Sequence, residues 1–135
     1  MAETLAVGTI LPELVRGPID RTTLALFAGA SHDHVRLHID SDYARDAGMG
    51  DVFAHGMLSM AYLGRLLTNW VPQQALRDFG VRFVAITHVG DRLTCRGTVV
   101  EKMEAHGEKW VRIELSTVDQ NGEVKVAGDA VVALP

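Results

Sequence analysis

The chain has 135 residues, of which 47% are hydrophobic and 22% are charged, and this is sufficient for one domain with its own core. This composition excludes a disordered chain. The formal net charge of −4, from 13 Lys and Arg against 17 Asp and Glu, leaves no basic surface for phosphates, so no nucleic-acid partner is expected.

Cysteine content and hydrophobic runs bear on the compartment. The single cysteine, Cys95, cannot form an internal disulfide or a thiolate metal cluster, which suits a reducing compartment. Residues 1–8 lack the basic and apolar regions of an export signal, and no window approaches the roughly 18 apolar residues of a membrane span. We therefore expect a cytoplasmic protein with no membrane partner.

The N-terminal half is predicted to be mainly helical. Residues 8–15 are typical of an entry segment or edge strand, and Gly17-Pro18 ends it. Asp20 is a candidate N-cap for a helix over about 21–30. A helical turn at about 42–47 precedes the longest apolar segment, about 54–71, where apolar residues recur every three to four positions. This segment predicts a mostly buried central helix that Pro72 stops.

After Pro72 the apolar period changes from 3.6 to 2, which predicts strands. They are expected at about 79–87, 91–104, 108–119 and 123–134, with Asn121-Gly122 as a hairpin turn. An antiparallel meander with the long helix on one face is the hotdog arrangement, so we predict a single α+β hotdog domain over 1–135. A ferredoxin-like sandwich is the alternative, but it requires strands and helices to alternate.

A polar stretch over residues 31–40 holds three of the six histidines. Four residues here are of types that bind metals: His32, Asp33, His34 and His38. They do not match the HxHxDH motif of binuclear zinc hydrolases, because Arg36 and Leu37 stand where that motif requires Asp and His. We therefore expect no metal. The alternative is an acid–base pair of Asp33 and His38, since a histidine titrates near neutral pH and a carboxylate can orient it. A solvated loop, with Asp33 capping a turn, also fits the composition.

The second candidate site is Ala54-His55-Gly56-Met57, at the start of the predicted central helix. A helix N-terminus offers free backbone N–H groups and the positive end of the helix dipole, and Gly56 allows a ligand carbonyl to approach. This is how an oxyanion hole is built, with Gly56, His55 and Met57 as oxyanion or substrate-binding residues. The alternative is that Gly56 only relieves crowding and His55 is a hydrogen-bonded core histidine.

These motifs resemble the MaoC-like family of (R)-specific enoyl-CoA hydratases. The resemblance covers most of the chain: residues 27–40, 51–58 and 81–83, and the closing segment 128–135. The family motif S-G-D-x-N-P-[LIV]-H places its catalytic Asp and His on Asp33 and His38. His32, Val35 and Arg36 stand where that motif has Gly, Asn and Pro, and Gly64 stands where some relatives have a serine.

The resemblance implies hydration of a trans-2-enoyl thioester to the (R)-3-hydroxyacyl thioester, or the reverse dehydration. The substrate would be an acyl-CoA or acyl-carrier-protein thioester, the smallest unit a dimer, and no metal or redox cofactor is needed. Family members that act on bulky steroid side chains also lack the Asn-Pro pair. Two alternatives stay open, namely a hotdog acyl-CoA thioesterase and a partner subunit of a heteromeric hydratase with little activity alone. A homodimer or higher oligomer is expected, and a heteromer is the other possibility.

Overall fold

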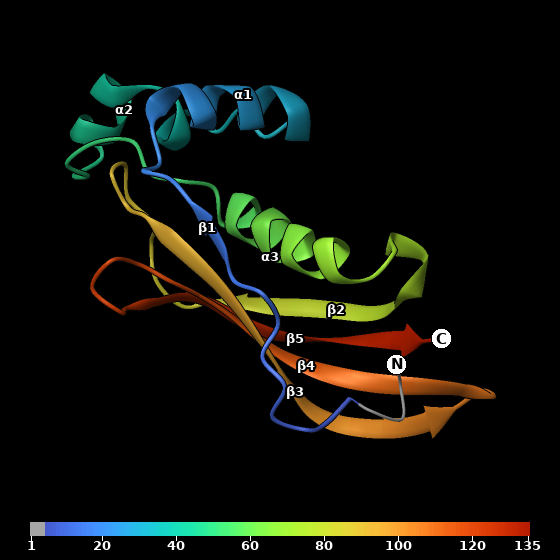
Figure 1. Cartoon of the computed structure of the whole chain (residues 1–135). Coiled ribbons are helices and arrows are strands. Elements are labelled where there is room, and N and C mark those ends of the chain that lie inside the picture. The colour runs from blue at the N-terminus through green and yellow to red at the C-terminus, as the bar shows by residue number, and fades with distance from the viewer. Residues whose placement is uncertain (1–4) are drawn as a thin grey trace.

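A five-stranded antiparallel sheet curls around one long helix in the computed structural model, which describes residues 5–135 (Figure 1). Residues 1–4 of the predicted domain lie outside the described residues. The spatial order of the strands is β1-β3-β4-β5-β2. Their bounds are Leu14–Arg16 for β1, Leu76–Phe83 for β2, Leu93–Ala105 for β3, Glu108–Val118 for β4 and Val124–Leu134 for β5. The predicted helix wrapped by a curled antiparallel sheet is confirmed.

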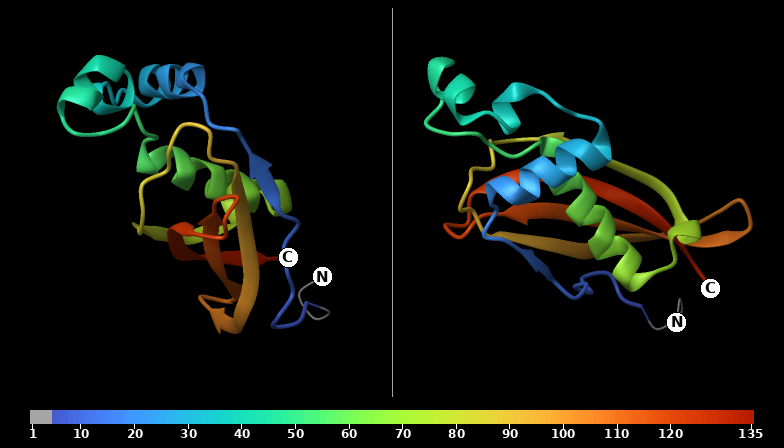
Figure 2. Two further views of the ribbon diagram at one scale, coloured as in Figure 1. Left: turned by 90° about the vertical axis from the view of Figure 1, so that its left-hand side faces the viewer. Right: turned by 90° about the horizontal axis from the view of Figure 1, so that it is seen from above.

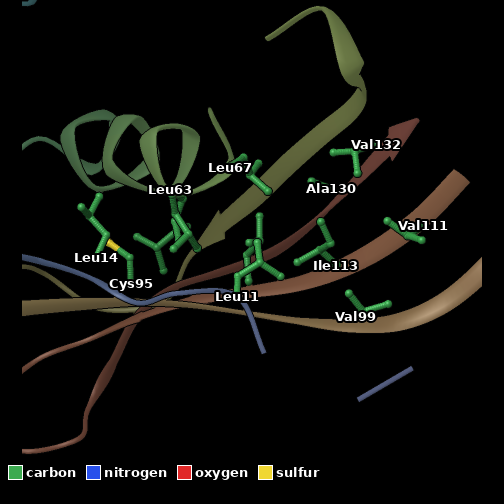
Figure 3. Close-up of a cluster of buried hydrophobic side chains, with 13 residues drawn as sticks. Leu11, Leu14, Leu63, Leu67, Cys95, Val99, Val111, Ile113, Ala130 and Val132 are labelled. Carbon is green, nitrogen blue, oxygen red and sulfur yellow. The ribbon is translucent and has the colours of Figure 1, made fainter. Parts of the chain in front are cut away.

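The central helix α3, Gly56–Trp70, packs one face onto the concave side of the sheet. Leu63 and Leu67 are fully buried and belong to the main core together with the inward-facing Cys95, Ile113 and Ala130 of the sheet (Figure 3). Burying one leucine side chain contributes roughly 1.5–3 kcal/mol to the free energy of folding. The leucines of α3 are buried against the alternating apolar residues of the strands, and this packing holds α3 in place. The thiol of Cys95 has its pKa raised by burial to about 12 and is unreactive.

Two shorter helices, α1 (Arg21–Ser31) and α2 (Ser41–Asp46), lie on the side of α3 that faces away from the sheet (Figures 1 and 2). Each begins with an aspartate N-cap: Asp20 accepts a hydrogen bond from the Thr23 backbone N–H, and Asp40 accepts one from that of Tyr43. Single 3-10 turns occupy Arg36–His38 and Gln73–Ala75. None of the helices formed by residues 5–135 is long and apolar enough to cross a membrane.

Two predictions about the sheet are wrong. The first strand after Pro72 spans Leu76–Phe83 instead of 79–87, because the backbone N–H groups of Val84 and Ala85 both donate to the Lys125 carbonyl and the ladder ends there. The four C-terminal strands also do not form one meander. Only β3, β4 and β5 do, while β2 pairs with β5, so residues 84–92 carry the chain from one edge of the sheet across to β3.

Candidate active site

Asp33 and His38 flank a sharp change of direction after α1. The helix ends at His32, which adopts a left-handed conformation with φ of 62° and donates its backbone N–H to the Ala28 carbonyl. The Asp33 backbone N–H donates to the same carbonyl at 3.1 Å. The following 3-10 turn begins after Val35 and ends on His38, whose backbone N–H donates to the Val35 carbonyl at 3.0 Å. This turn brings both predicted catalytic side chains to the wall of one cavity.

The His38 ring is fixed by a carbonyl. Its Nδ1 lies 2.7 Å from the carbonyl oxygen of Phe53, and because a carbonyl only accepts, Nδ1 carries the proton and donates. The other nitrogen, Nε2, therefore presents a lone pair when the ring is neutral. The Phe53 ring also meets the His38 ring edge-on, with centroids 5.1 Å apart. This arrangement leaves His38 ready to accept a proton at Nε2.

His55 lies behind His38 and does not line the cavity. The side chain is 1% exposed, its ring stacks on that of His38 with centroids 3.9 Å apart, and its Nε2–H donates to the Asp33 carbonyl at 3.1 Å. Burial lowers the pKa of His55, so the ring is neutral near pH 7. The structure thus places this residue as a link between the Asp33 backbone and the His38 ring. This agrees with the hydrogen-bonded core histidine that the sequence offers as an alternative, while an oxyanion or substrate contact stays a prediction.

The start of α3 supplies unpaired donors. His55 is the N-cap, yet its side chain makes no capping hydrogen bond. The backbone N–H groups of Gly56 and Met57 donate to no acceptor among residues 5–135. Gly56 packs closely against Phe83, since a Cβ at this position would lie 2.9 Å from the Phe83 ring. The close contact with Phe83 agrees with a glycine that relieves crowding, and Gly56 also lines the cavity described below, so its oxyanion role stays a prediction.

The cavity has a volume of about 440 Å³. Its wall combines the predicted catalytic pair, the first turn of α3 and the segment that follows β2. The lining residues are Asp33, His38, Phe53, Ala54, Gly56, Met57, Ser59, Phe83, Val84, Ala85, Ile86, Thr87 and Val126. The sequence prediction missed Ser59 and residues 83–87. Ser59 carries a usable signal, because it lies three residues after Gly56 and so on the same helix face.

A second, apolar cavity of about 380 Å³ adjoins the first. Asp33 and Met57 line both cavities, so the two are neighbours across these side chains. Between α1 and α3 the wall is made by Phe27, Met60, Ala61 and Gly64, and Phe79 of β2 adds to it. Small residues on α3 leave room here.

Asp33, His38 and His55 are also the one group of three potential metal ligands close together in the described part of the chain, with ligand atoms within 4.8 Å of one another. The set considered from the sequence differs, since His32 and His34 are exposed and contact each other edge-on at 5.3 Å. In the observed group, each ring already donates one N–H to a backbone carbonyl. Metal-bound histidines often have such a partner, so these contacts are compatible with a ligand role as well as with an acid–base role.

Comparison with known proteins adds to this geometry. The sequence profile described as "MaoC like domain" matches residues 8–121. An (R)-specific enoyl-CoA hydratase of Rhodospirillum rubrum is 29% identical over 119 residues, covering 87% of this chain and 81% of that protein. A 3-hydroxyacyl-thioester dehydratase Z of Mycobacterium tuberculosis is 31% identical over 116 residues, covering 81% of this chain and 76% of that protein.

Among solved structures, the unliganded R-hydratase PhaJ1 of Pseudomonas aeruginosa superposes with a TM-score of 0.85 at 29% identity, covering 99% of this chain and 84% of that chain. The match extends over the sheet, α3 and the helices beyond it. The profile match, the relatives and this superposition agree with the resemblance read from residues 27–40 and 51–58. The chain therefore belongs to the MaoC-like domain family and has its hotdog fold.

Proposed function

We propose that the protein is an enoyl-CoA hydratase and 3-hydroxyacyl dehydratase that interconverts a trans-2-enoyl thioester and the (R)-3-hydroxyacyl thioester. The observation that carries this proposal is the meeting of Asp33, a His38 ring with free Nε2, and the unpaired N–H groups of Gly56 and Met57 on one cavity. These supply the carboxylate, base and oxyanion donors that the reaction requires. Membership of the family supports the same reaction class.

In the hydration direction, His38 Nε2 accepts a proton from water while the water oxygen bonds to C3. The C2=C3 electron pair moves toward the thioester, whose oxygen becomes an enolate oxygen held by the N–H groups of Gly56 and Met57. Asp33 orients the water, and the proton removed from it is returned to C2 from the Asp33–His38 pair, so that one water is added overall. One oxyanion donor contributes roughly 3 kcal/mol in enzymes where it has been tested.

We propose that this reaction uses no metal or redox cofactor. Hydration changes no net oxidation state, and the charge that develops is met by helix N–H groups instead of a cation. Activity should therefore persist unchanged after dialysis against EDTA. Loss of activity that Zn²⁺ or another divalent ion restores would instead assign Asp33, His38 and His55 to a metal.

The direct test is loss of the conjugated-enoyl absorbance when purified protein meets crotonyl-CoA, with chiral analysis of the product. Asp33→Asn and His38→Ala should each reduce kcat by at least a thousandfold, since each removes an acid–base group. His34→Ala is the matched control, because His34 is exposed and does not line the cavity. If folded wild-type protein consumes no enoyl-CoA and releases no free CoA, the chain alone is not a hydratase and the partner-subunit alternative takes its place. Release of CoA would indicate the thioesterase.

We further propose that the apolar second cavity takes the acyl group, and that a bulky group such as a steroid side chain fits it. Gly64 and Ala61 leave the space, and Met57 and Met60 provide flexible apolar walls. Gly64→Leu should lower kcat/KM at least tenfold for a bulky enoyl-CoA while changing it less than threefold for crotonyl-CoA. Arg65→Leu, an exposed position on the same helix, is the control. Equal losses on both substrates would place the acyl group elsewhere.

A further inference from the structure

Ser59 lies one turn into α3, on the wall of the site cavity. The side chain is 1% exposed, and its hydroxyl has no hydrogen-bond partner among residues 5–135. Buried hydroxyl groups in native proteins are nearly always hydrogen-bonded, because an unpaired one is destabilising. Because Ser59 lies on a cavity wall, its unpaired hydroxyl is available to a partner that enters the cavity.

The position of Ser59 on the helix indicates which partner. Side chains on a helix lean toward its N-terminus, so the Ser59 hydroxyl leans toward the first turn, where the Gly56 and Met57 N–H groups are unpaired. The positive end of the helix dipole lies at the same place. A buried hydroxyl and free backbone donors thus converge on one region of the cavity, and together they favour an oxygen that carries negative charge.

We propose that the Ser59 hydroxyl donates a hydrogen bond to the thioester carbonyl oxygen of the substrate, beside the backbone donors of α3. This inference rests on the proposed hydratase function and adds a side-chain donor to its oxyanion hole. A hydroxyl rotates freely about its C–O bond, so Ser59 can follow the oxygen as the carbonyl becomes an enolate. Since the charge on that oxygen grows in the transition state, the contact is stronger there than with the bound substrate.

The test is Ser59→Ala, assayed on crotonyl-CoA. We expect kcat to fall about 100-fold, as for other oxyanion donors, while KM changes less than threefold. The melting temperature should stay the same or rise, because the substitution removes an unpaired buried hydroxyl. A structural role predicts the opposite pattern, with lowered stability and preserved kcat.

Thr117→Val is the matched control. Thr117 is fully buried in β4, and its hydroxyl is also unpaired, but it does not line the site cavity. We expect this variant to be at least as stable as wild type with an unchanged kcat. A fall in kcat of less than tenfold for Ser59→Ala, or an equal fall for Thr117→Val, would overturn the proposal.

A spectroscopic measurement tests the contact without turnover. In the Asp33→Asn background, where crotonyl-CoA should persist unreacted, the infrared stretching frequency of the bound thioester carbonyl should move to a higher wavenumber on adding Ser59→Ala, because a hydrogen bond to the oxygen is lost. An unchanged frequency overturns the proposal. This readout also separates it from the proposed function: if wild type consumes no enoyl-CoA, the hydratase assignment fails, and the carbonyl frequency of bound crotonyl-CoA still decides about Ser59.

Discussion

His32 has a left-handed backbone conformation and lies directly before the loop that carries the predicted catalytic pair, Asp33 and His38. It ends α1 with φ of 62°, where a side chain is strained and glycine is not. The MaoC-like motif has glycine at this position, and the left-handed conformation gives the physical reason. The strain is located one residue before Asp33.

We expect His32→Gly to raise the free energy of unfolding by about 0.5–1 kcal/mol, because relief of the left-handed strain exceeds the added flexibility of the unfolded chain. Urea denaturation measures this difference. His34→Gly is the control, since it removes the same contact between the two rings without a positive φ, and it should not stabilise. Equal effects of the two substitutions would show that the backbone angle is not the cause.

The buried ring of His55 is expected to make the stability of the folded protein depend on pH. Burial lowers its pKa in the folded protein below the value of about 6.5 that it has when unfolded. The unfolded chain therefore binds the proton first as pH falls. The stability contributed by neutral His55 is complete above pH 6.5 and is lost as pH falls from there toward the lowered folded pKa, by at most about 1.4 kcal/mol per pH unit.

We expect His55→Gln, whose amide can still donate to the Asp33 carbonyl, to flatten this dependence. Denaturant unfolding of both proteins at pH 7.5 and pH 5.5 provides the comparison. The difference in unfolding free energy between the two pH values should be smaller in the variant. Parallel pH dependences would mean that other groups cause the acid sensitivity.

At the scale of elements, Lys125 of β5 holds the segment that follows β2. Its side chain is 3% exposed, and its Nζ donates to the Ile86 carbonyl at 2.8 Å and lies 3.6 Å from Asp119 and 3.8 Å from Asp91. Its own carbonyl accepts from the N–H groups of Val84 and Ala85. One residue thus ends the β2–β5 ladder and fixes a wall of the candidate active-site cavity.

Lys125→Met should lower the free energy of unfolding by about 3 kcal/mol, because Asp91 and Asp119 stay buried without their cation. Lys102→Met, at an exposed position of β3, should change it by less than about 0.5 kcal/mol. Chemical denaturation of the two variants measures both values. If Lys125→Met lowered the free energy of unfolding by less than 1 kcal/mol, the buried Asp91 and Asp119 would not depend on the Lys125 cation for their stability.

Elements with strong local signals are the ones that the sequence predicted well. The 3.6-residue period of α3, the Asp20 cap and the Asn121-Gly122 turn depend on neighbouring residues, and each is found close to its predicted place. In the segment 84–87 three of the four residues, Val84, Ile86 and Thr87, are β-branched, so it has the local signal of a strand. It leaves the sheet because of Lys125, about 40 residues later, which no local pattern can indicate.

The same distinction applies to the candidate site. Asp33, His38, Gly56 and Met57 could be selected because their chemistry is visible in short motifs, and all four line the cavity. For His55 the sequence offered a hydrogen-bonded core histidine as one alternative, and the structure agrees with it, but the hydrogen-bond partner could not be predicted because the Asp33 carbonyl is 22 residues away. Their assigned catalytic roles remain predictions that the crotonyl-CoA assay tests.

At the scale of the whole molecule, the edge strand β2 and the residues after it leave an apolar surface beside the cavity. Phe83 is 56% exposed, Val84 52%, Ile86 42% and Met57 51%. Among residues 5–135, β2 pairs only with β5, so the backbone groups on its other side have no partner strand there. A second copy related by a two-fold axis can cover both features and narrow the entrance to the cavity.

We therefore expect light scattering to give about twice the 14.7 kDa mass of one chain. Val84→Lys should shift the protein toward monomers, because a charge in the covered surface is desolvated by association. Val15→Lys is the matched control, since Val15 is 46% exposed on β1 at the opposite edge of the sheet, and this variant should remain dimeric. If the wild-type protein were a monomer at 100 µM, self-association would be contradicted. If the wild type were a dimer and only Val15→Lys dissociated it, the interface would lie at β1. Because Phe83 of β2 lines the same cavity as Asp33 and His38, dissociation at this edge is expected to reduce enoyl-CoA turnover, whereas dissociation at β1 is not.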